Sequence, residues 1–317
     1  MWKNHFAVLV AFSMAVGGIA HAFPNLPPKS MGAVGDSVTA GTLAGFSRDS
    51  AESWTAFVKS TNTGGPIHFP ALSWATGSDA ASGSFLLRLI DFFHILTPPT
   101  ANFAVPGAEV EAVRTLQLPK LSAWSQANLL QKYPELLTVF IGGNDVCAPN
   151  LSQMTEIAAF EASLRGLLED VLLTSPTTRI LLVPTPKGFN SFQKNFAALP
   201  IVGSGSTNPG GKDVTCQDFW DLYEKVGTGC PTVLHRGRDA PWIQAVDDRI
   251  AAFDEIMSNL TLELATQFHM LDGRARITLA HSAEQIEVRA EELSVDCFHP
   301  NALGQAKLAA AVWQDAN

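Results

Sequence analysis

Charged residues are scarce in this sequence: Asp, Glu, Lys and Arg make up 16% of its 317 residues, whereas hydrophobic residues make up 46%. A chain of this length and composition buries a large core, so it is neither a disordered nor a low-complexity protein. Basic residues are the scarcer kind, with 21 Lys and Arg against 30 Asp and Glu, and they form no cluster. Because nucleic acids are bound through phosphates neutralised by Lys and Arg, the formal net charge of -9 argues against a nucleic-acid partner.

The sequence also lacks several patterns that would indicate other kinds of protein. No C-x-x-C or H-x-x-x-H spacing occurs, which argues against a zinc site. No internal repeat occurs, and no linker separates two independent sets of elements, so we expect one domain. Beyond the N-terminal region, no apolar stretch is long enough to span a bilayer.

The N-terminus has the three parts of a secretory signal peptide. Lys3 supplies a positive charge, residues 6–19 are apolar, and Ala20-His21-Ala22 is an A-x-A cleavage site. The apolar part is short for a membrane-spanning helix, which needs about 20 residues, and an uncleaved anchor is the alternative. We therefore predict that residues 1–22 are removed and that residues 23–317 form a secreted, extracellular domain.

Four cysteines lie in the predicted mature chain: Cys147, Cys216, Cys230 and Cys297. An even number of cysteines in an exported protein favours two disulfides, for which three pairings exist. We expect Cys216 to close a local loop with Cys230, which leaves Cys147 to pair with Cys297. Two glycosylation sequons begin at Asn150 and Asn259, and they matter only if the host glycosylates its proteins.

Short apolar runs alternate with helical patterns along the rest of the chain. Candidate strands begin near residues 30, 100, 136, 179 and 267, and candidate helices cover residues 50–59, 85–95, 119–132, 154–173, 243–264 and 301–313. Residues 61–84 and 186–241 are rich in Gly, Pro and polar residues, and we expect loops there, the second a long insertion of the functional kind. The prediction is one three-layer α/β/α domain with a five-stranded, mainly parallel, flavodoxin-like sheet.

The first candidate for chemistry is Ser37, in the glycine-bracketed turn of residues 35–41 that directly follows the first predicted strand. A serine hydroxyl is a poor nucleophile unless a base takes its proton and donors stabilise the oxyanion. Gly-Asp-Ser alone is a common tripeptide, and a helix cap is the ordinary interpretation of such a serine. Ser37 is therefore of interest only if the chain supplies the other groups.

The chain supplies these groups in three further places. Gly107 follows the second predicted strand, Asn144 follows the third, and Asp296 and His299 lie on a loop before the last predicted helix. Each alone would be an ordinary turn or surface residue. Because ligands bind beyond the carboxyl ends of parallel strands, we expect Ser37, Gly107 and Asn144 to meet at one edge of the sheet.

These blocks resemble those of the SGNH, or GDSL-type, serine hydrolase superfamily. The matching stretches are Gly35-Asp36-Ser37, Asn102 with Gly107, Gly142-Gly143-Asn144-Asp145, and Asp296 with His299. The G-x-S-x-G elbow of the α/β-hydrolases is absent. A closer resemblance, carried by residues 35–41, 72–74, 104–108, 138–147 and 296–299, is to the secreted phospholipase B-like (lysophospholipase) branch, although residues 186–241 depart from it.

The resemblance implies a role for each matching residue. Ser37 would attack an ester carbonyl, His299 would take and later deliver its proton, and Asp296 would orient His299. The backbone N–H groups of Ser37 and Gly107 and the side-chain amide of Asn144 would hold the oxyanion. No metal or organic cofactor is implied.

The implied substrate is a phospholipid or lysophospholipid, from which a fatty acid would be released during transient contact with a lipid surface. Apolar residues of the long insertion would either line an acyl site or cap the core: Phe189, Phe192, Phe196, Leu199, Ile201 and Trp220. One alternative is an esterase for short acyl groups or for acetylated carbohydrate. An alternative of another class is a secreted binding protein that has lost catalysis, although the intact Ser37, Asn144, Asp296 and His299 argue against it.

Overall fold

The structure is a computed structural model that describes residues 26–226, 229–271 and 273–316. The predicted signal peptide, residues 1–22, lies outside the described residues. Within the described ranges, no helix is both long and apolar enough to cross a membrane.

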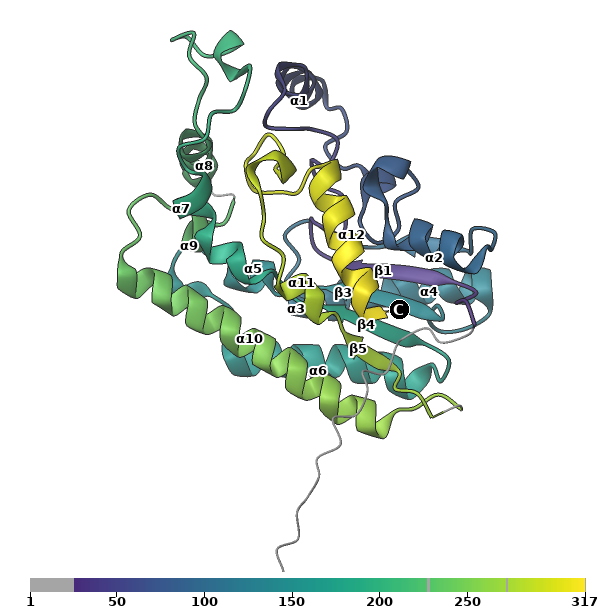
Figure 1. Ribbon diagram of the computed structural model, residues 1–317. Helices are drawn as coiled ribbons and strands as arrows, with labels where there is room; N and C mark the ends of the chain where they lie inside the picture. The colour runs from purple at the N-terminus through teal and green to yellow at the C-terminus, as the bar shows by residue number, and fades with distance from the viewer. Residues whose placement is uncertain (1–25, 227–228, 272, 317) are drawn as a thin grey trace, which may run out of the picture.

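Five strands form one sheet at the centre of the fold (Figure 1). They are β1 (Met31–Gly35), β2 (Thr100–Asn102), β3 (Leu136–Phe140), β4 (Arg179–Val183) and β5 (Ile277–Leu279), in the spatial order β2-β1-β3-β4-β5. Helices cover both faces, so β1, β3 and β4 are buried along their whole length and their sequences are mainly apolar. The predicted α/β/α fold is confirmed, and the four strand pairings are parallel.

The predicted position of the last strand is wrong. The helix α10 (Ala240–Gln267) continues into the segment where that strand was expected to begin, and β5 forms ten residues later. Leu271, four residues beyond the expected start of that strand, is fully exposed, whereas Ile277 and Leu279 are buried. A run of three residues is too short to show a pattern, which is why the sequence does not distinguish β5 from the segment before it.

Two groups of helices cover the sheet. One face carries α3 (Val110–Ala112), α4 (Leu118–Leu129), α6 (Ile157–Thr174) and α10, and the other carries α2 (Phe85–Phe93), α11 (His281–Glu284) and α12 (Ala302–Ala316). Strand side chains alternate between the two cores: Leu137 packs into the first and Leu136 into the second. The predicted apolar stripes of α6 and α10 are the faces that meet, where the rings of Phe160 and Phe253 stack with centroids 3.9 Å apart.

The remaining elements outside residues 187–234 are short, except for the helix α1. They are α1 (Ala51–Thr63), η1 (Pro70–Leu72), η2 (Ala80–Ser82), η3 (Val113–Gln117), α5 (Gly143–Val146), η4 (Leu151–Gln153) and η7 (Ala290–Glu292). Asn301 precedes α12, and its side chain accepts hydrogen bonds from the backbone N–H groups of Leu303 and Gly304, as expected of an N-cap. The beginning of α12 is therefore capped two residues after His299.

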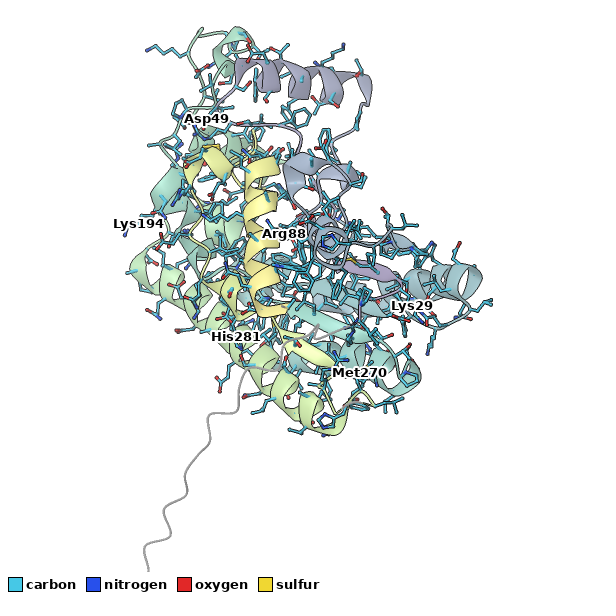
Figure 2. The ribbon with its side chains drawn as sticks, turned by 45° about the vertical axis from the view of Figure 1, so that its right-hand side comes forward. Lys29, Asp49, Arg88, Lys194, Met270 and His281 are labelled. Atoms are coloured by element: carbon cyan, nitrogen blue, oxygen red, sulfur yellow. A yellow bond between two sulfur atoms is a disulfide. The ribbon has the colours of Figure 1, made fainter. Side chains whose placement is uncertain are left out.

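Residues 187–234 form a helical cap rather than the expected long loop. The cap contains η5 (Lys187–Ser191), α7 (Phe192–Phe196), η6 (Ser204–Ser206), α8 (Cys216–Lys225) and α9 (Pro231–Leu234). These helices are too short to give a sustained period in the sequence. Figure 2 shows Asp49, after the turn that follows β1, at the upper left of the molecule, and Lys29, just before β1, on its right-hand side and lower. The carboxyl ends of the strands therefore face the cap and α1.

Two disulfides join the cap to the rest of the chain. All four cysteines are paired, as expected, but the pairing is Cys147–Cys230 and Cys216–Cys297, so the predicted pairing is wrong. The loops that these bonds close span 83 and 81 residues. Proximity along the sequence favoured the wrong pairing, because Cys216, at the beginning of α8, lies against Cys297 on the loop that precedes α12.

We predict that peptide mapping of the unreduced protein will find these two cross-links and no free thiol. Alkylation before reduction should leave every cysteine unmodified, because both bonds are formed in the folded chain. A peptide joining Cys216 to Cys230 would contradict this fold of the cap. The reduced and alkylated protein, in which all four cysteines become modified, is the control.

Candidate active site

Ser37 lies two residues beyond the end of β1, in a turn whose start requires glycine. Gly35 has a φ of +146°, and a Cβ there would lie 2.4 Å from the backbone oxygen of Phe140 in β3. The side chain of Gln117 fixes the same residue from the other side, because its amide donates to the Gly35 oxygen and accepts from the Gly35 N–H, both at 2.8 Å. Ser37 itself is 8% exposed. The turn therefore holds this hydroxyl in one place.

The structure brings Ser37, His299 and Asp296 together in a chain of hydrogen bonds. The Nε2 atom of His299 lies 2.8 Å from the Ser37 hydroxyl, and its Nδ1 atom lies 2.5 Å from a carboxylate oxygen of Asp296. Asp296 is buried, and its other oxygen accepts the backbone N–H groups of Phe298 and His299. With Asp296 ionised, Nδ1 carries the proton and Nε2 is free to accept the proton of Ser37.

The environment shifts the pKa values of this pair in opposite directions. Burial disfavours the charged imidazolium of His299, but the Asp296 carboxylate, the hydrogen bond to it and the charge of Asp36 outweigh burial and raise the His299 pKa. Burial also disfavours ionised Asp296, but the charge of His299 and the hydrogen bonds from His299 and Phe298 hold its pKa below the usual value. Burial raises the pKa of Asp36 to about 6, although the Val38 N–H opposes that shift.

Gly107 and Asn144 lie on the loops that follow β2 and β3. Gly107 has a φ of +78°, and no atom lies within 4 Å of where its Cβ would be, so a substrate can approach its backbone closely. The side-chain amide of Asn144 donates to the Ala108 oxygen at 3.2 Å. In the described part of the chain this bond uses one of the two amide hydrogens of Asn144, which leaves the second for a ligand.

Two further side chains, for which the sequence predicts no role, hold these loops in place. The Asp145 carboxylate accepts the Val110 N–H at 3.2 Å, which fastens α5 to the loop containing Gly107. Burial raises the pKa of Asp145 to about 7. The Asn102 amide donates to the Thr39 oxygen at 2.8 Å, and so fixes the turn after Ser37 to β2. Their place in the motifs beside Gly107 and Asn144 is the only signal that the sequence offers for them.

The cap is attached to the loop that carries Asn144 and to the loop that carries Asp296 and His299. Cys297, which lies between Asp296 and His299, is bonded to Cys216 at the beginning of α8. The Trp220 indole N–H of the same helix donates to the Asp296 backbone oxygen at 2.9 Å. Cys147, which directly follows α5, is bonded to Cys230 before α9. The cap therefore fixes the His299 loop and the Asn144 loop relative to each other.

A cavity opens beside Ser37, Asn144 and His299, and most of its lining is apolar. Its walls include Val38, Phe140, Phe189, Phe192, Phe298 and Leu308. Of the six apolar insertion residues named above, Phe189 and Phe192 line this cavity. The other four pack in or against the core instead: Phe196, Leu199, Ile201 and Trp220. The core-capping interpretation is therefore confirmed for these four residues, and the acyl site stays a prediction. In the described residues, no group of three or more His, Cys, Asp or Glu side chains is arranged to hold a metal ion.

The family of the protein follows from its sequence match. Residues 31–312 match the family described as GDSL-like Lipase/Acylhydrolase. This match covers most of the chain, so the protein belongs to the GDSL-like lipase/acylhydrolase family. Membership of that family supports a serine ester hydrolase activity, in agreement with the class of chemistry that the site residues allow.

Solved structures of similar fold include two ester hydrolases. One is Axe2, an acetylxylan esterase from Geobacillus stearothermophilus, at 14% identity, covering 91% of this chain and 94% of that chain, with a TM-score of 0.45. Another is an extracellular lipase from Streptomyces rimosus, at 14% identity, covering 91% and 99% of the two chains, with a TM-score of 0.43. No curated protein matches the sequence. Likenesses this distant do not bear on the substrate.

We predict that activity falls at acid pH with a midpoint above the ordinary histidine pKa of about 6.5. His299 must be neutral to accept a proton, and its raised pKa keeps it protonated to higher pH. The effect of pH on folding stability has the opposite sign. The raised pKa of His299 stabilises the fold at pH values below the unfolded-state pKa, and this contribution is lost as pH rises through the folded-state pKa. The measurement is kcat/KM against pH, which reports the free enzyme.

Asp36→Asn is the matched variant for this measurement, because it removes the charge of Asp36 while its amide oxygen can still accept the Val38 N–H. The acid midpoint should move to lower pH in this variant, since the Asp36 charge raises the His299 pKa. A wild-type midpoint below 6.5, or a midpoint that rises in Asp36→Asn, would contradict the electrostatics described here.

A second prediction concerns Asn144. If its free amide hydrogen stabilises an oxyanion, Asn144→Ala lowers kcat by about 10² to 10³-fold with little change in KM. If the side chain only shapes the loop through Ala108, the same change lowers the melting temperature and alters both constants modestly. Steady-state kinetics and thermal unfolding of one preparation distinguish the two roles, and a near-normal kcat in the folded variant would rule out the first.

Proposed function

We propose that this protein is a secreted carboxylic ester hydrolase that releases fatty acid from phospholipid or lysophospholipid. The observation that supports this class of substrate is the apolar cavity beside the Ser37 hydroxyl, which is lined by Phe189, Phe192 and Phe298. An acyl chain gains about 0.8 kcal/mol for each CH₂ group that it buries, so a cavity of this character favours chains longer than acetyl. The resemblance to the phospholipase B-like branch supports the same class of substrate.

In the proposed reaction, Ser37 attacks the ester carbonyl while His299 takes the hydroxyl proton through Nε2. A bond forms between the Ser37 oxygen and the acyl carbon, and the alcohol leaves with the proton that His299 returns. Water then attacks the acyl-enzyme with His299 again as base, which releases the fatty acid and restores Ser37. Asp296 holds the imidazole and stabilises its positive charge; the 2.5 Å contact supports this role.

The negative oxygen that develops on the acyl carbon is held by three donors in this proposal. They are the Ser37 N–H, the Gly107 N–H and the Asn144 amide, each from a loop after a different strand. The open space at Gly107 and the unused amide hydrogen of Asn144 support the assignment. No metal or organic cofactor takes part.

Export from the cytoplasm is part of the proposal. Two disulfides are typical of proteins that fold in an oxidising compartment, and they agree with the signal peptide predicted from the sequence. Asn150 and Asn259 are both exposed, so either would be open to glycosylation in a host that carries it out.

The test is hydrolysis of p-nitrophenyl esters from acetyl to palmitoyl, together with fatty-acid release from lysophosphatidylcholine. We expect kcat/KM to rise with chain length beyond acetyl and the lysophospholipid to be cleaved. Ser37→Ala should lose on the order of 10³-fold or more while its melting temperature stays close to that of the wild type.

Two results would contradict the proposed substrate class or the proposed activity. Hydrolysis confined to acetyl esters, with acetylated carbohydrate as the better substrate, would favour the carbohydrate esterase alternative. Absence of hydrolysis from a correctly folded preparation, with all four cysteines paired, would favour a binding protein.

A further inference from the structure

One wall of the cavity is formed by residues 285–293, a segment that we call the strap; its one regular element is the short helix η7 (Ala290–Glu292). Its residues alternate: Ile286 and Val288 line the cavity, while Glu287 and Arg289 are exposed. Ile286 packs against one hydrophobic core and Val288 against the other, so the strap closes the gap between them. The position of this segment therefore decides how wide the cavity is.

Both ends of the strap are firmly attached. At its beginning, the Ile286 N–H donates to Ala283 in α11, and Ser282 of α11 is bonded through backbone and side chain to Asp315 of α12. Figure 2 marks this region by His281, the first residue of α11. At its end, Asn301 donates from its backbone to the Glu292 oxygen and from its side chain to the Glu291 and Leu293 oxygens. The ends are thus fixed to α11 and α12.

The middle of the strap depends on Lys307. The Lys307 ammonium donates to the Glu287 oxygen at 2.5 Å and to the two Glu292 carboxylate oxygens at 2.9 and 3.0 Å. Glu292 in turn accepts the Arg289 N–H at 2.8 Å. Within the described residues, the bond from Lys307 is the one hydrogen bond made by the backbone of Glu287 and Val288. Lys307 also lines the cavity itself.

Partial burial strengthens this attachment. The side chains of Lys307 and Glu292 are 31% and 11% exposed, so water screens the pair less than it screens a surface ion pair. Lys307 lies on α12 one turn beyond Gly304, where the backbone of the helix approaches Glu292 so closely that a Cβ would lie 2.7 Å from its oxygen. The helix α12 therefore contacts the strap closely at Gly304 and is hydrogen-bonded to it through the Lys307 ammonium.

We propose that Lys307 determines specificity for the acyl group by holding the strap against the cavity. This inference rests on the proposed ester hydrolase function and adds a determinant of chain length to it. With Lys307 in place, Ile286 and Val288 form a fixed wall that limits how large an acyl chain can enter. Without the Lys307 ammonium, the middle of the strap has no hydrogen bond to α12. Ile286 and Val288 can then move outward, and the cavity admits longer acyl chains.

The test compares kcat/KM for p-nitrophenyl laurate and butyrate in the wild type and in Lys307→Met. Methionine keeps an apolar stem in the cavity wall but donates no hydrogen bond. We expect the laurate to butyrate ratio to rise about tenfold, the order of effect that small changes in an apolar pocket produce. Glu292→Gln, which can still accept the Arg289 N–H but loses the charge beside Lys307, should shift the ratio in the same direction by less. If Lys307→Met does not fold, the laurate to butyrate ratio of Glu292→Gln alone tests the role of Lys307.

Lys194→Met is the matched control. Lys194 is exposed on α7, carries the same charge and does not line the cavity (Figure 2). Its ratio should equal that of the wild type. Equal losses on both esters in Lys307→Met and Glu292→Gln, or unchanged ratios in both, would overturn the role of Lys307 while leaving the esterase proposal intact. A wild type that cleaves neither ester would overturn both.

Discussion

The parallel pairing of β1 with β2 and β3 is the constraint on which the rest of the site depends. It sets Ala33 beside Asn102 and Gly35 beside Phe140, so the three strands end at one edge of the sheet. Ser37, Gly107 and Asn144 follow those ends and cannot be far apart, whatever the loops do. The close approach of Gly35 to Phe140 explains why glycine begins the first loop, because any Cβ would separate the two strands.

The sheet does not position the remaining two site residues, and the cap does this instead. Asp296 and His299 lie on a loop outside the sheet, held by the Cys216–Cys297 bond and by the Trp220 indole. The second disulfide attaches the same cap to the loop of Asn144. The cap also supplies Phe189 and Phe192 to the cavity wall. One insertion thus joins the proposed catalytic geometry to the shape of the proposed acyl site, so changes in the cap affect both.

Strong local patterns made much of the fold predictable. Apolar runs mark the buried strands β1, β3 and β4, and apolar residues at helical spacing mark α6 and α10. The position of each motif directly after a predicted strand places Ser37, Gly107 and Asn144 at the same edge of the sheet. Features that depend on distant contacts were missed: the three-residue β5, the short cap helices and the pairing of Cys216 with Cys297. Nothing local distinguishes the partly buried Lys307 from the exposed lysines either, because its partners Glu287 and Glu292 lie on a segment whose sequence shows no pattern.

In the proposed mechanism, His299 activates Ser37 as the nucleophile. Treating the folded protein with a serine-directed fluorophosphonate and locating the adduct by mass spectrometry tests it most directly. Among the serines that the structure describes, Ser37 is the one whose hydroxyl lies within hydrogen-bond distance of the His299 Nε2 atom, at 2.8 Å, so we expect one adduct, on Ser37. An adduct on another serine, or none on the folded protein, would contradict the account.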